Sequence, residues 1–496
     1  MRAAWLVFAV AVGLYVPTAR HGFVQDDWAI VALNPAVHSL PAGLRAVDDP
    51  YWPPPSQAGG WRPLTILSFA VDWMLSRGAP AWLHLANALW HGLASVLVLA
   101  VLARWLPTRA AAAAALVFAV HPVHVEAVAG LVGRGELLPA TALLLGVLAV
   151  RGRHWAGALA SMATAMLAKE SGVVVGVVIL LYCWLDREVG RPPGWFIASW
   201  AVVTAAYLVV WRAVGGAMLA DVTAPFIGAT TGERLTLALP AIWRAALLLV
   251  WPAALSVDYN PQVIPVPAGF TAPALGGGAV IALVIAIAWR YRWQAPHLAW
   301  AAGAAALAYL PTSNLLFPTG VVLAERNLYV AVVLPAVIIG MVIAQTDRLA
   351  GRHVALALTA LVVGALAVRS AVRLPDWRSN RTHLLGLLRD HPESARGQVW
   401  AAAVLGAIGD TAGARVSYDR AIELFDRDPH VLGAAARFYL DRGDPVAAGV
   451  LADRARSILP REREALNVAY LLARAAGDTA RAAALADSLQ QPPRRR

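Results

Sequence analysis

The sequence predicts an all-α protein in which a multispan membrane bundle is followed by a small helical solenoid. The 496 residues are 59% hydrophobic and 14% charged, and the mean hydropathy is +0.60. Apolar segments of membrane-spanning length recur through the first 371 residues, whereas residues 372–496 hold 19 Arg and 15 Asp or Glu. An ordinary soluble enzyme is therefore excluded. We expect a membrane domain over 1–371, a water-soluble domain over 372–490 and a basic tail over 491–496.

The charge and the cysteine count exclude further classes of function. The net charge is +11, but most of the 40 Arg side chains are explained by loops that orient membrane spans, so nucleic acid is not an expected partner. Cys183 is the single cysteine and can form neither an internal disulfide nor a Cys-based metal site. Chemistry must therefore come from carboxylates, His, Arg and the single lysine, Lys169.

Eleven apolar segments are candidates for membrane spans. A helix needs about 17 to 25 apolar residues to cross the hydrocarbon core. The first segment is predicted to be an uncleaved span, because no persuasive small-residue cleavage site follows it. The candidates lie near residues 3–18, 82–103, 109–121, 135–150, 154–168, 171–185, 194–213, 271–289, 297–311, 328–346 and 353–371.

Arginines in alternate loops predict the orientation of the bundle. Short basic loops stay on the cytoplasmic side, which puts the N-terminus inside and, with eleven spans, the C-terminal domain outside. Residues 234–252 are apolar enough to cross the membrane, but a span there would place Arg290 and Arg292 on the outer side. A re-entrant or interfacial helix is therefore predicted for this segment. The other orienting arginines are Arg2, Arg104, Arg109, Arg151, Arg153, Arg187, Arg191, Arg348 and Arg352.

The C-terminal domain carries an internal repeat. Gly-Asp dipeptides begin at Gly409, Gly443 and Gly477, so their spacing is 34 residues each time. That period is typical of the tetratricopeptide helical hairpin. Two to three such repeats would form a small concave platform of the kind that binds a peptide or protein.

Polar residues on one helical face mark the second span. His84, Asn87 and His91 occupy positions i, i+3 and i+7, which share one side of a helix. A polar stripe inside a span faces a bundle interior or an aqueous cavity. Interhelical hydrogen bonding is the alternative to a role in substrate binding.

The predicted outer loops hold the remaining unusual polar residues. The first carries Asp26 and Asp27 in FVQDDWAI and Arg62 in WRPLT. The second, FAVHPVHVEAVAGLVGRGELL, has a His-x-x-His-x-Glu spacing that could ligate a metal or serve structural hydrogen bonding. Its polar residues and those of the later loops are His121, His124, Glu126, Arg134, Glu136, Lys169, Glu170, Glu325 and Arg326.

Together these residues predict an outward-facing site for a lipid-linked phosphate. Carboxylates can act as general bases toward a hydroxyl, and Arg and Lys bind phosphate. A transporter or flippase of lipid-linked sugars is one alternative, although the internal span repeats that it should show are not apparent. A membrane-anchored repeat scaffold is another, but a plain anchor would not need polar residues in so many loops.

The strings FVQDDWAIVALN, WRPLT, HLANALWH, FAVHPVHVEAVAGLVGRGELL, AKESG and SNLLFPTGVVLAERNLYV, in this order, resemble the transmembrane and tetratricopeptide repeat (TMTC) family of protein O-mannosyltransferases and their bacterial relatives. The resemblance covers nearly the whole membrane domain. It departs from the family where AKESG lacks the usual serine, where Val-Ala follows Tyr329, and in its shorter repeat array.

This resemblance implies a GT-C glycosyltransferase fold and an inverting transfer on the outer face. The donor would be mannose or another hexose on a polyprenyl phosphate, and the acceptor a hydroxyl, with Ser or Thr of an exported protein favoured and the repeats a candidate docking site. Asp26 or Asp27 would be the base, with Asp26 slightly favoured. Asp27 would then bind the acceptor or, as in some enzymes of this class, a divalent cation, so a cation is a candidate cofactor.

The same resemblance implies roles for the cations and for the other polar residues. Arg326 and Lys169 are the first choices to stabilise the departing phosphate, with Arg62 and Arg134 next. Glu126 would orient the acceptor or hold His124. Independently of the resemblance, the Ala- and Arg-rich composition indicates a GC-rich bacterial source. The expected membrane is therefore the bacterial inner membrane, and the expected carrier lipid is undecaprenol. The substrate-binding set is Arg62, His84, Asn87, His91, His121, His124, Glu126, Arg134, Glu136, Lys169, Glu170, Glu325 and Arg326.

A reporter fused after Arg496 tests the predicted topology. We expect periplasmic reporter activity, because an odd number of spans carries the C-terminal domain outward. A fusion after Arg151 should instead report a cytoplasmic position. A signal after Arg496 that is cytoplasmic only, as the arginines between Arg369 and Arg381 would favour, contradicts this topology.

Overall fold

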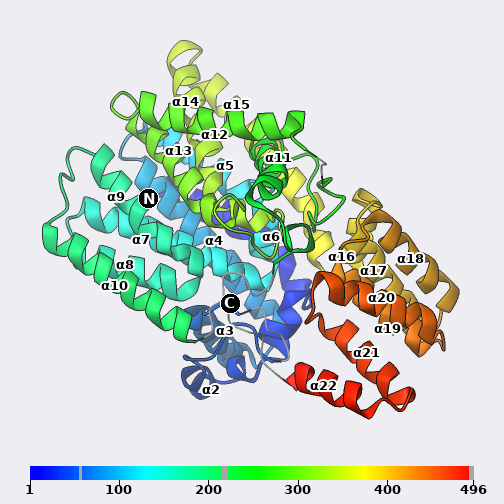
Figure 1. The fold of residues 1–496 in the computed structure, drawn as a ribbon. Helices are drawn as coiled ribbons and strands as arrows, with labels where there is room; N and C mark the ends of the chain where they lie inside the picture. The colour runs from blue at the N-terminus through cyan, green and yellow to red at the C-terminus, as the bar shows by residue number, and fades with distance from the viewer. Residues whose placement is uncertain (55–58, 215–221, 267–268, 491–496) are drawn as a thin grey trace.

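Helices make up the regular structure of the ranges 1–54, 59–214, 222–266 and 269–490, which the computed structural model describes. Within these ranges the only β contact is an isolated bridge between Pro261 and Ile264. Figure 1 shows one large helical bundle and, beside it, an array of helical pairs formed by the C-terminal residues. The predicted basic tail over 491–496 lies outside the described residues.

Among the residues that the structure describes, seven helical segments are long and apolar enough to cross a membrane, as expected of a multi-pass membrane protein. Short 3-10 turns extend α1, α7, α14 and α15. The helices are α1 (Arg2–Tyr15), α4 (Pro80–Leu102), α7 (Arg134–Arg151), α10 (Gly194–Ala213), α12 (Ala272–Arg290), α14 (Val333–Leu349) and α15 (Arg352–Arg373).

The predicted number of eleven spans is not confirmed. Four of the eleven segments fold as helices of 13 or 14 residues, which rise only about 20 Å and so fall short of a hydrocarbon core about 30 Å thick. These helices are α5 (Thr108–Val120), α8 (Trp155–Ala168), α9 (Val173–Leu185) and α13 (Pro296–Tyr309).

Four further helices complete the membrane domain. The segment predicted to be re-entrant or interfacial forms the 20-residue α11, which is not among the seven candidate spans of the described residues. Its start is fixed by a capping box, in which Thr230 and Glu233 each accept from the other's backbone N–H. The four helices are α2 (Leu40–Arg45), α3 (Pro63–Ser76), α6 (His124–Ala129) and α11 (Thr231–Val250).

Burial separates the central helices of the bundle from the peripheral ones. The main apolar core gathers buried residues of α4, α5, α7, α9, α13 and α14. In the apolar windows of α10, α12 and α15, by contrast, only 11% of the residues are buried within the protein. A helix that is apolar all round yet unburied is suited to contact with lipid.

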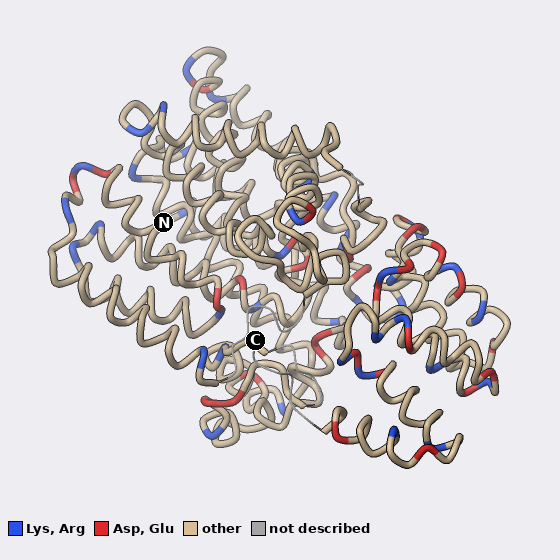
Figure 2. The backbone as a smooth tube through the Cα atoms, viewed as in Figure 1, with Lys and Arg blue, Asp and Glu red and all other residues tan. Residues whose placement is uncertain are grey.

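The basic loops meet at one end of the bundle. Arg104 pairs with Asp186 of the α9–α10 loop at 3.2 Å, and Arg109 pairs with Asp347 at the end of α14 at 3.1 Å. The guanidinium of Arg187 lies 4.8 Å from the ring centroid of Trp293. Figure 2 shows basic segments along the upper left margin of the bundle and mixed charges over the C-terminal helices. Loops predicted to share one side of the membrane are therefore neighbours in space.

The C-terminal residues form three successive helical hairpins after the single helix α16 (Asn380–Asp390). The Gly-Asp dipeptide has the same geometry in each hairpin. Gly409, Gly443 and Gly477 adopt φ values of 89°, 79° and 75°, which favour glycine, and the following Asp caps the next helix. The hairpins are α17 (Ala395–Ala407) with α18 (Thr411–Leu424), α19 (Pro429–Asp441) with α20 (Pro445–Ile458), and α21 (Arg463–Ala475) with α22 (Thr479–Gln490).

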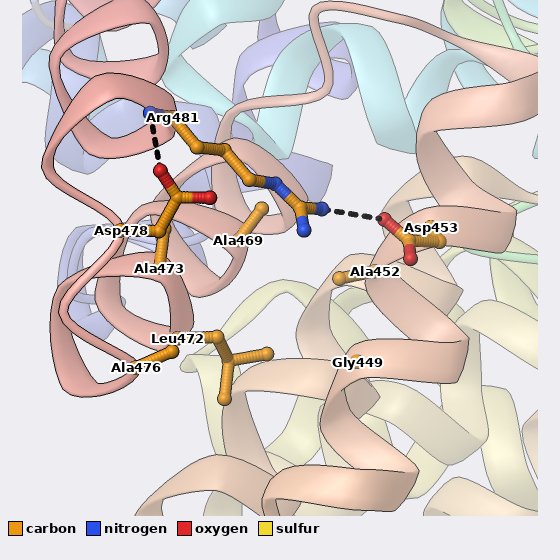
Figure 3. A pocket seen from close by; sticks show the side chains of 9 residues that line it. All are labelled: Gly449, Ala452, Asp453, Ala469, Leu472, Ala473, Ala476, Asp478 and Arg481. Carbon is orange, nitrogen blue, oxygen red and sulfur yellow. Dashed lines mark hydrogen bonds and ion pairs between the residues drawn. The ribbon is translucent and has the colours of Figure 1, made fainter.

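Small residues leave a cavity of about 250 Å³ between the last two hairpins. Figure 3 shows Gly449 and Ala452 facing Ala469 and Ala473 across it. Arg481 spans the opening and lies 3.8 Å from Asp453, and both side chains are more than half exposed. An exposed ion pair at this distance adds little stability.

A buried ion pair fixes the arrangement of α3, α4 and α7. Arg134 of α7 is fully buried and pairs with Asp72 of α3. Its Nε donates to Asn87 Oδ1 at 2.8 Å and its Nη2 donates to the carbonyl of Leu83 at 3.2 Å, both on α4. The guanidinium also lies 4.4 Å from the ring centroid of Phe69. The guanidinium of Arg134 therefore donates its hydrogen bonds to groups inside the protein.

Removing Arg134 should destabilise the bundle strongly. We expect Arg134→Ala to lower the free energy of unfolding by about 3–5 kcal/mol, because Asp72 keeps a buried, unpaired charge. Arg109→Ala, which breaks an exposed pair, is the matched control and should cost about 0–1 kcal/mol. Reversible unfolding in mixed detergent micelles measures both changes. Equal losses in the two variants would contradict this assignment.

Candidate active site

A pocket of about 510 Å³ lies at the end of the bundle opposite the basic loops. It is lined by the loops that follow α1, α5, α8, α11, α13 and α15, together with α16 and α17. These loops are far apart in the sequence and were all predicted to face outward. The pocket brings together seven of the predicted site residues, Asp26, Asp27, Arg62, Glu136, Lys169, Glu170 and Arg326.

The two acids of the first loop have different surroundings. Asp27 is 1% exposed and accepts from the backbone N–H of Val24 and of Val132, each at 3.1 Å. Burial raises the pKa of Asp27 to about 7, against the effect of those hydrogen bonds. Asp26 is partly exposed in the pocket and has no hydrogen bond or ion pair within the described residues. Asp27 therefore joins two loops, whereas Asp26 is available to a ligand.

The residue before Asp26 is held by the C-terminal part of the chain. Gln25 adopts φ +50°, an uncommon value for a residue with a side chain, and its N–H donates to Asn380 Oδ1 of α16 at 2.7 Å. The N–H of Gly22 also donates to the carbonyl of Arg378 at 3.0 Å. The position of the acidic loop thus depends on residues that follow the last span.

Each cation of the pocket pairs with a carboxylate from another segment. Lys169 Nζ pairs with Glu136, and the Asn327 Oδ1 atom lies 3.4 Å away. Arg62 Nε donates to Glu170 Oε2 at 2.9 Å. The adjacent Lys169 and Glu170 therefore bind different partners rather than each other. Burial lowers the pKa of Lys169, and the Glu136 carboxylate opposes that shift.

Glu126 positions Arg326 rather than His124. One Glu126 oxygen pairs with Arg326 Nη1, and the other accepts from the Arg326 backbone N–H at 2.9 Å. Within the described residues, Arg326 Nε and Nη2 have no hydrogen bond, and the side chain is 29% exposed. Arg326 consequently keeps donors available on the pocket side.

The polar face of α4 is buried, and its side chains form hydrogen bonds with three loops. His84 Nε2 hydrogen-bonds to the carbonyl of Gly22 at 3.2 Å. Asn87 Nδ2 donates to the carbonyl of Gly130 at 3.1 Å. His91 Nδ1 hydrogen-bonds to the Tyr329 hydroxyl at 2.8 Å. These three side chains do not line the pocket, and the hydrogen bonds named here are structural contacts between α4 and the loops.

The histidines of the second loop also hydrogen-bond to carbonyls. His121 Nε2 contacts the Leu249 carbonyl and His124 Nε2 contacts the Tyr329 carbonyl, each at 3.1 Å. Because Glu126 pairs with Arg326, the three side chains of the His-x-x-His-x-Glu motif bind separate partners and do not meet at one metal-binding centre. Among the described residues, no group of three or more His, Cys, Asp or Glu is arranged to hold a metal ion.

Two further predicted residues lie behind the pocket. Arg134 is used by the buried pair with Asp72, so its predicted contact with phosphate is not supported by its position. Glu325 is fully buried, accepts from the Ser256 N–H and the Tyr259 hydroxyl at 2.8 Å, and lies 3.7 Å from Arg373 Nη2. Burial raises the pKa of Glu325 to about 7.

Sequence reasoning missed several residues of the pocket. Asp258 follows α11, and Asn327 directly follows the predicted Arg326. Asn327 lies in a loop already singled out for its neighbours, which was a usable signal, whereas no residue of the loop that holds Asp258 was singled out. The others come from the chain after the last span, and no local pattern indicates them, because only tertiary contacts bring them here. They are Trp377, His383, Arg396 and Trp400.

Comparison with known proteins identifies homologues, some of which align with most of the chain. The protein O-mannosyl-transferase TMTC3 of Mus musculus is 26% identical over 485 residues, which cover 86% of this chain and 50% of the relative. Tmtc1 of Drosophila melanogaster is 34% identical over 195 residues, or 37% of this chain and 23% of the relative. TMTC4 of Homo sapiens is 40% identical over 144 residues, or 23% of this chain and 19% of the relative.

The TMTC proteins are therefore homologues of this chain, as the motifs predict, and the chain spans about half the length of the TMTC3 relatives. No protein-family model matches it. Among solved structures, the crystal structure of ArnT from Cupriavidus metallidurans bound to undecaprenyl phosphate is similar, with 16% identity and a TM-score of 0.39 over 97% of this chain and 79% of that one.

Proposed function

With TMTC proteins as homologues, we propose that this chain is an inverting membrane glycosyltransferase. It moves mannose or another hexose from a polyprenyl phosphate to a hydroxyl, with Ser or Thr of an exported protein as the acceptor. The names of the homologues support the reaction class and the protein acceptor. We place the reaction on the outer face of a bacterial inner membrane, with the N-terminus cytoplasmic.

The observation that carries this proposal is the contrast between Asp26 and its surroundings. Asp26 is the acid of the pocket without a partner among the described residues, while Arg62, Lys169 and Arg326 line the same cavity. A free carboxylate beside fixed cations suits a reaction in which a hydroxyl loses a proton as a phosphate departs.

These positions support the following transfer. The acceptor oxygen attacks the anomeric carbon and forms the new glycosidic bond while the bond from that carbon to the phosphate oxygen breaks. The Asp26 carboxylate takes the hydroxyl proton, and the electron pair of the broken bond leaves with the polyprenyl phosphate. Attack opposite the leaving group inverts the configuration at the anomeric carbon.

The paired cations are suited to receive that leaving group. Glu136, Glu170 and Glu126 hold Lys169, Arg62 and Arg326 in fixed positions before a ligand arrives. Preorganised donors stabilise developing negative charge without reorganising during the reaction. The carboxylates also lower the net charge of the empty pocket, which limits the cost of burying three cations.

Apolar residues give the lipid of the donor a path into the pocket. Trp211 at the end of α10 and Val173 at the start of α9 line the same cavity as Lys169. The side chains of Val202 and Val209 on α10 are largely exposed, as contact with lipid requires. We therefore place the polyprenyl chain along α10 and its phosphate beside Lys169 and Arg62.

Replacing the two acids separates the proposed base from its structural neighbour. We expect Asp26→Asn to lower hexose transfer by about 100- to 10,000-fold with little change in stability, because it removes general base catalysis. Asp27→Asn should lower the unfolding midpoint as well, since its amide would face a backbone N–H. The exposed Asp49→Asn, in the same loop, is the control. Full activity of Asp26→Asn, measured with a radiolabelled donor, would remove the proposed base.

Exchange of the single lysine tests whether a compact ammonium is required. We expect Lys169→Arg to lower turnover about tenfold, because the longer guanidinium cannot occupy the same position beside Glu136. Arg153→Lys, an exposed exchange at the opposite end of the bundle, should leave turnover unchanged. Wild-type turnover of Lys169→Arg would transfer the leading phosphate role to Arg326.

A further inference from the structure

The C-terminal domain supplies one wall of the pocket. Trp377 and His383 come from the turn before α16 and from α16, and Arg396 and Trp400 come from α17, the first helix of the hairpin array. Arg396 Nη1 lies 3.7 Å from Asp258 Oδ1 of the membrane domain. The end of the cavity away from the lipid-facing helices is thus a junction between the two domains.

Aromatic rings cover this wall. The ring centroids of Trp377 and His383 are 4.7 Å apart, and those of His383 and Trp400 are 6.1 Å apart. Trp377 and His383 are buried, whereas Trp400 and Arg396 are partly exposed. Large rings with a polar edge are common where one protein holds a segment of another.

The same wall contains buried polar atoms that lack a partner. Trp377 Nε1, His383 Nδ1 and Asp258 Oδ2 have no hydrogen-bond partner among the described residues. An unsatisfied buried donor or acceptor costs about 1–3 kcal/mol, so a native site pairs such groups with a ligand or water. Burial, with the nearby Arg373 charge, lowers the pKa of His383 to about 4, so its ring is neutral at pH 7. The indole donor and the carboxylate acceptor match the C=O and N–H of a polypeptide main chain.

The reaction geometry requires the acceptor to enter at this end. In an inverting displacement, nucleophile and leaving group occupy opposite faces of the anomeric carbon. Lys169, Arg62 and Trp211 mark the donor end of the pocket. Asp26 follows Gln25, whose N–H is held by Asn380 of α16, so the base lies next to the C-terminal wall.

We propose that Trp377, His383, Arg396, Trp400 and Asp258 form the subsite for the polypeptide that flanks the acceptor hydroxyl, and that the first hairpin thereby belongs to the active site. This inference rests on the proposed function and deepens it. Trp400 and Arg396 are the specificity-determining residues, because they are the partly exposed residues that the C-terminal domain contributes to the wall.

The test uses the full chain in lipid nanodiscs with undecaprenyl phosphate carrying mannose, glucose or galactose in turn. A Ser/Thr-rich synthetic polypeptide and a p-nitrophenyl hexoside are the two acceptors. We expect Trp400→Ala and Arg396→Ala to raise the polypeptide KM at least about tenfold, while the donor KM and the kcat at saturating polypeptide change less than about twofold. Trp400→Phe should restore most of the affinity because it keeps an aromatic ring.

Matched variants at positions that do not line the pocket control for general effects on the domain. Tyr470→Ala on α21 and the exposed Arg420→Ala on α18 should leave all parameters unchanged. An unchanged polypeptide KM in Trp400→Ala, a parallel loss in donor KM, or a KM effect on the hexoside acceptor instead of the polypeptide would each overturn the subsite. Absence of wild-type transfer from all three donors would overturn the proposed function itself, and the subsite with it.

Discussion

The pairing of buried charge is the constraint on which the rest of the molecule depends. A cation inside a membrane protein is tolerated where a carboxylate and hydrogen bonds replace its water. Here Arg134 meets Asp72, Lys169 meets Glu136, Arg62 meets Glu170 and Arg326 meets Glu126, and every pair joins segments far apart in the sequence. Because each charge needs its partner, the pairs also fix how the loops lie against one another. The arrangement of the loops at this end of the bundle is therefore set largely by electrostatics.

Two layers of polar residues follow from this constraint. The deeper layer consists of the α4 residues His84, Asn87 and His91, with Arg134, and it uses its hydrogen bonds to fasten backbone carbonyls and the Tyr329 hydroxyl. The upper layer lines the pocket, where Arg62 and Arg326 stay partly accessible, Lys169 is buried beside Glu136, and Asp26 has no hydrogen bond or ion pair among the described residues. The deeper layer makes the upper one rigid, and rigid donors are what a charged transition state requires.

Much of the candidate site could be predicted from the sequence, because charged residues in apolar surroundings are rare and informative. Asp26, Lys169 and Arg326 were recognised by residue type and place alone, and they meet in one cavity. Arg134 and Glu325 look the same in sequence, yet they lie behind the pocket. A buried structural pair and a ligand-binding pair carry the same residues, and only the position relative to the cavity distinguishes them. The count of eleven spans is not confirmed, because apolar composition does not reveal where a helix ends.

The sequence by itself determined the helical class, the division into an apolar and a charged domain, and the 34-residue hairpin period, since these depend on local periodicity, composition and the backbone preferences of Gly and Asp. Only the tertiary structure decided that Glu126 holds Arg326, that Lys169 and Glu170 bind different partners, and that Trp400 and Arg396 share a cavity with Asp26. The physical reason is distance along the chain. Contacts between residues that are distant along the chain are selected by the packing of the whole bundle, and no local pattern records them.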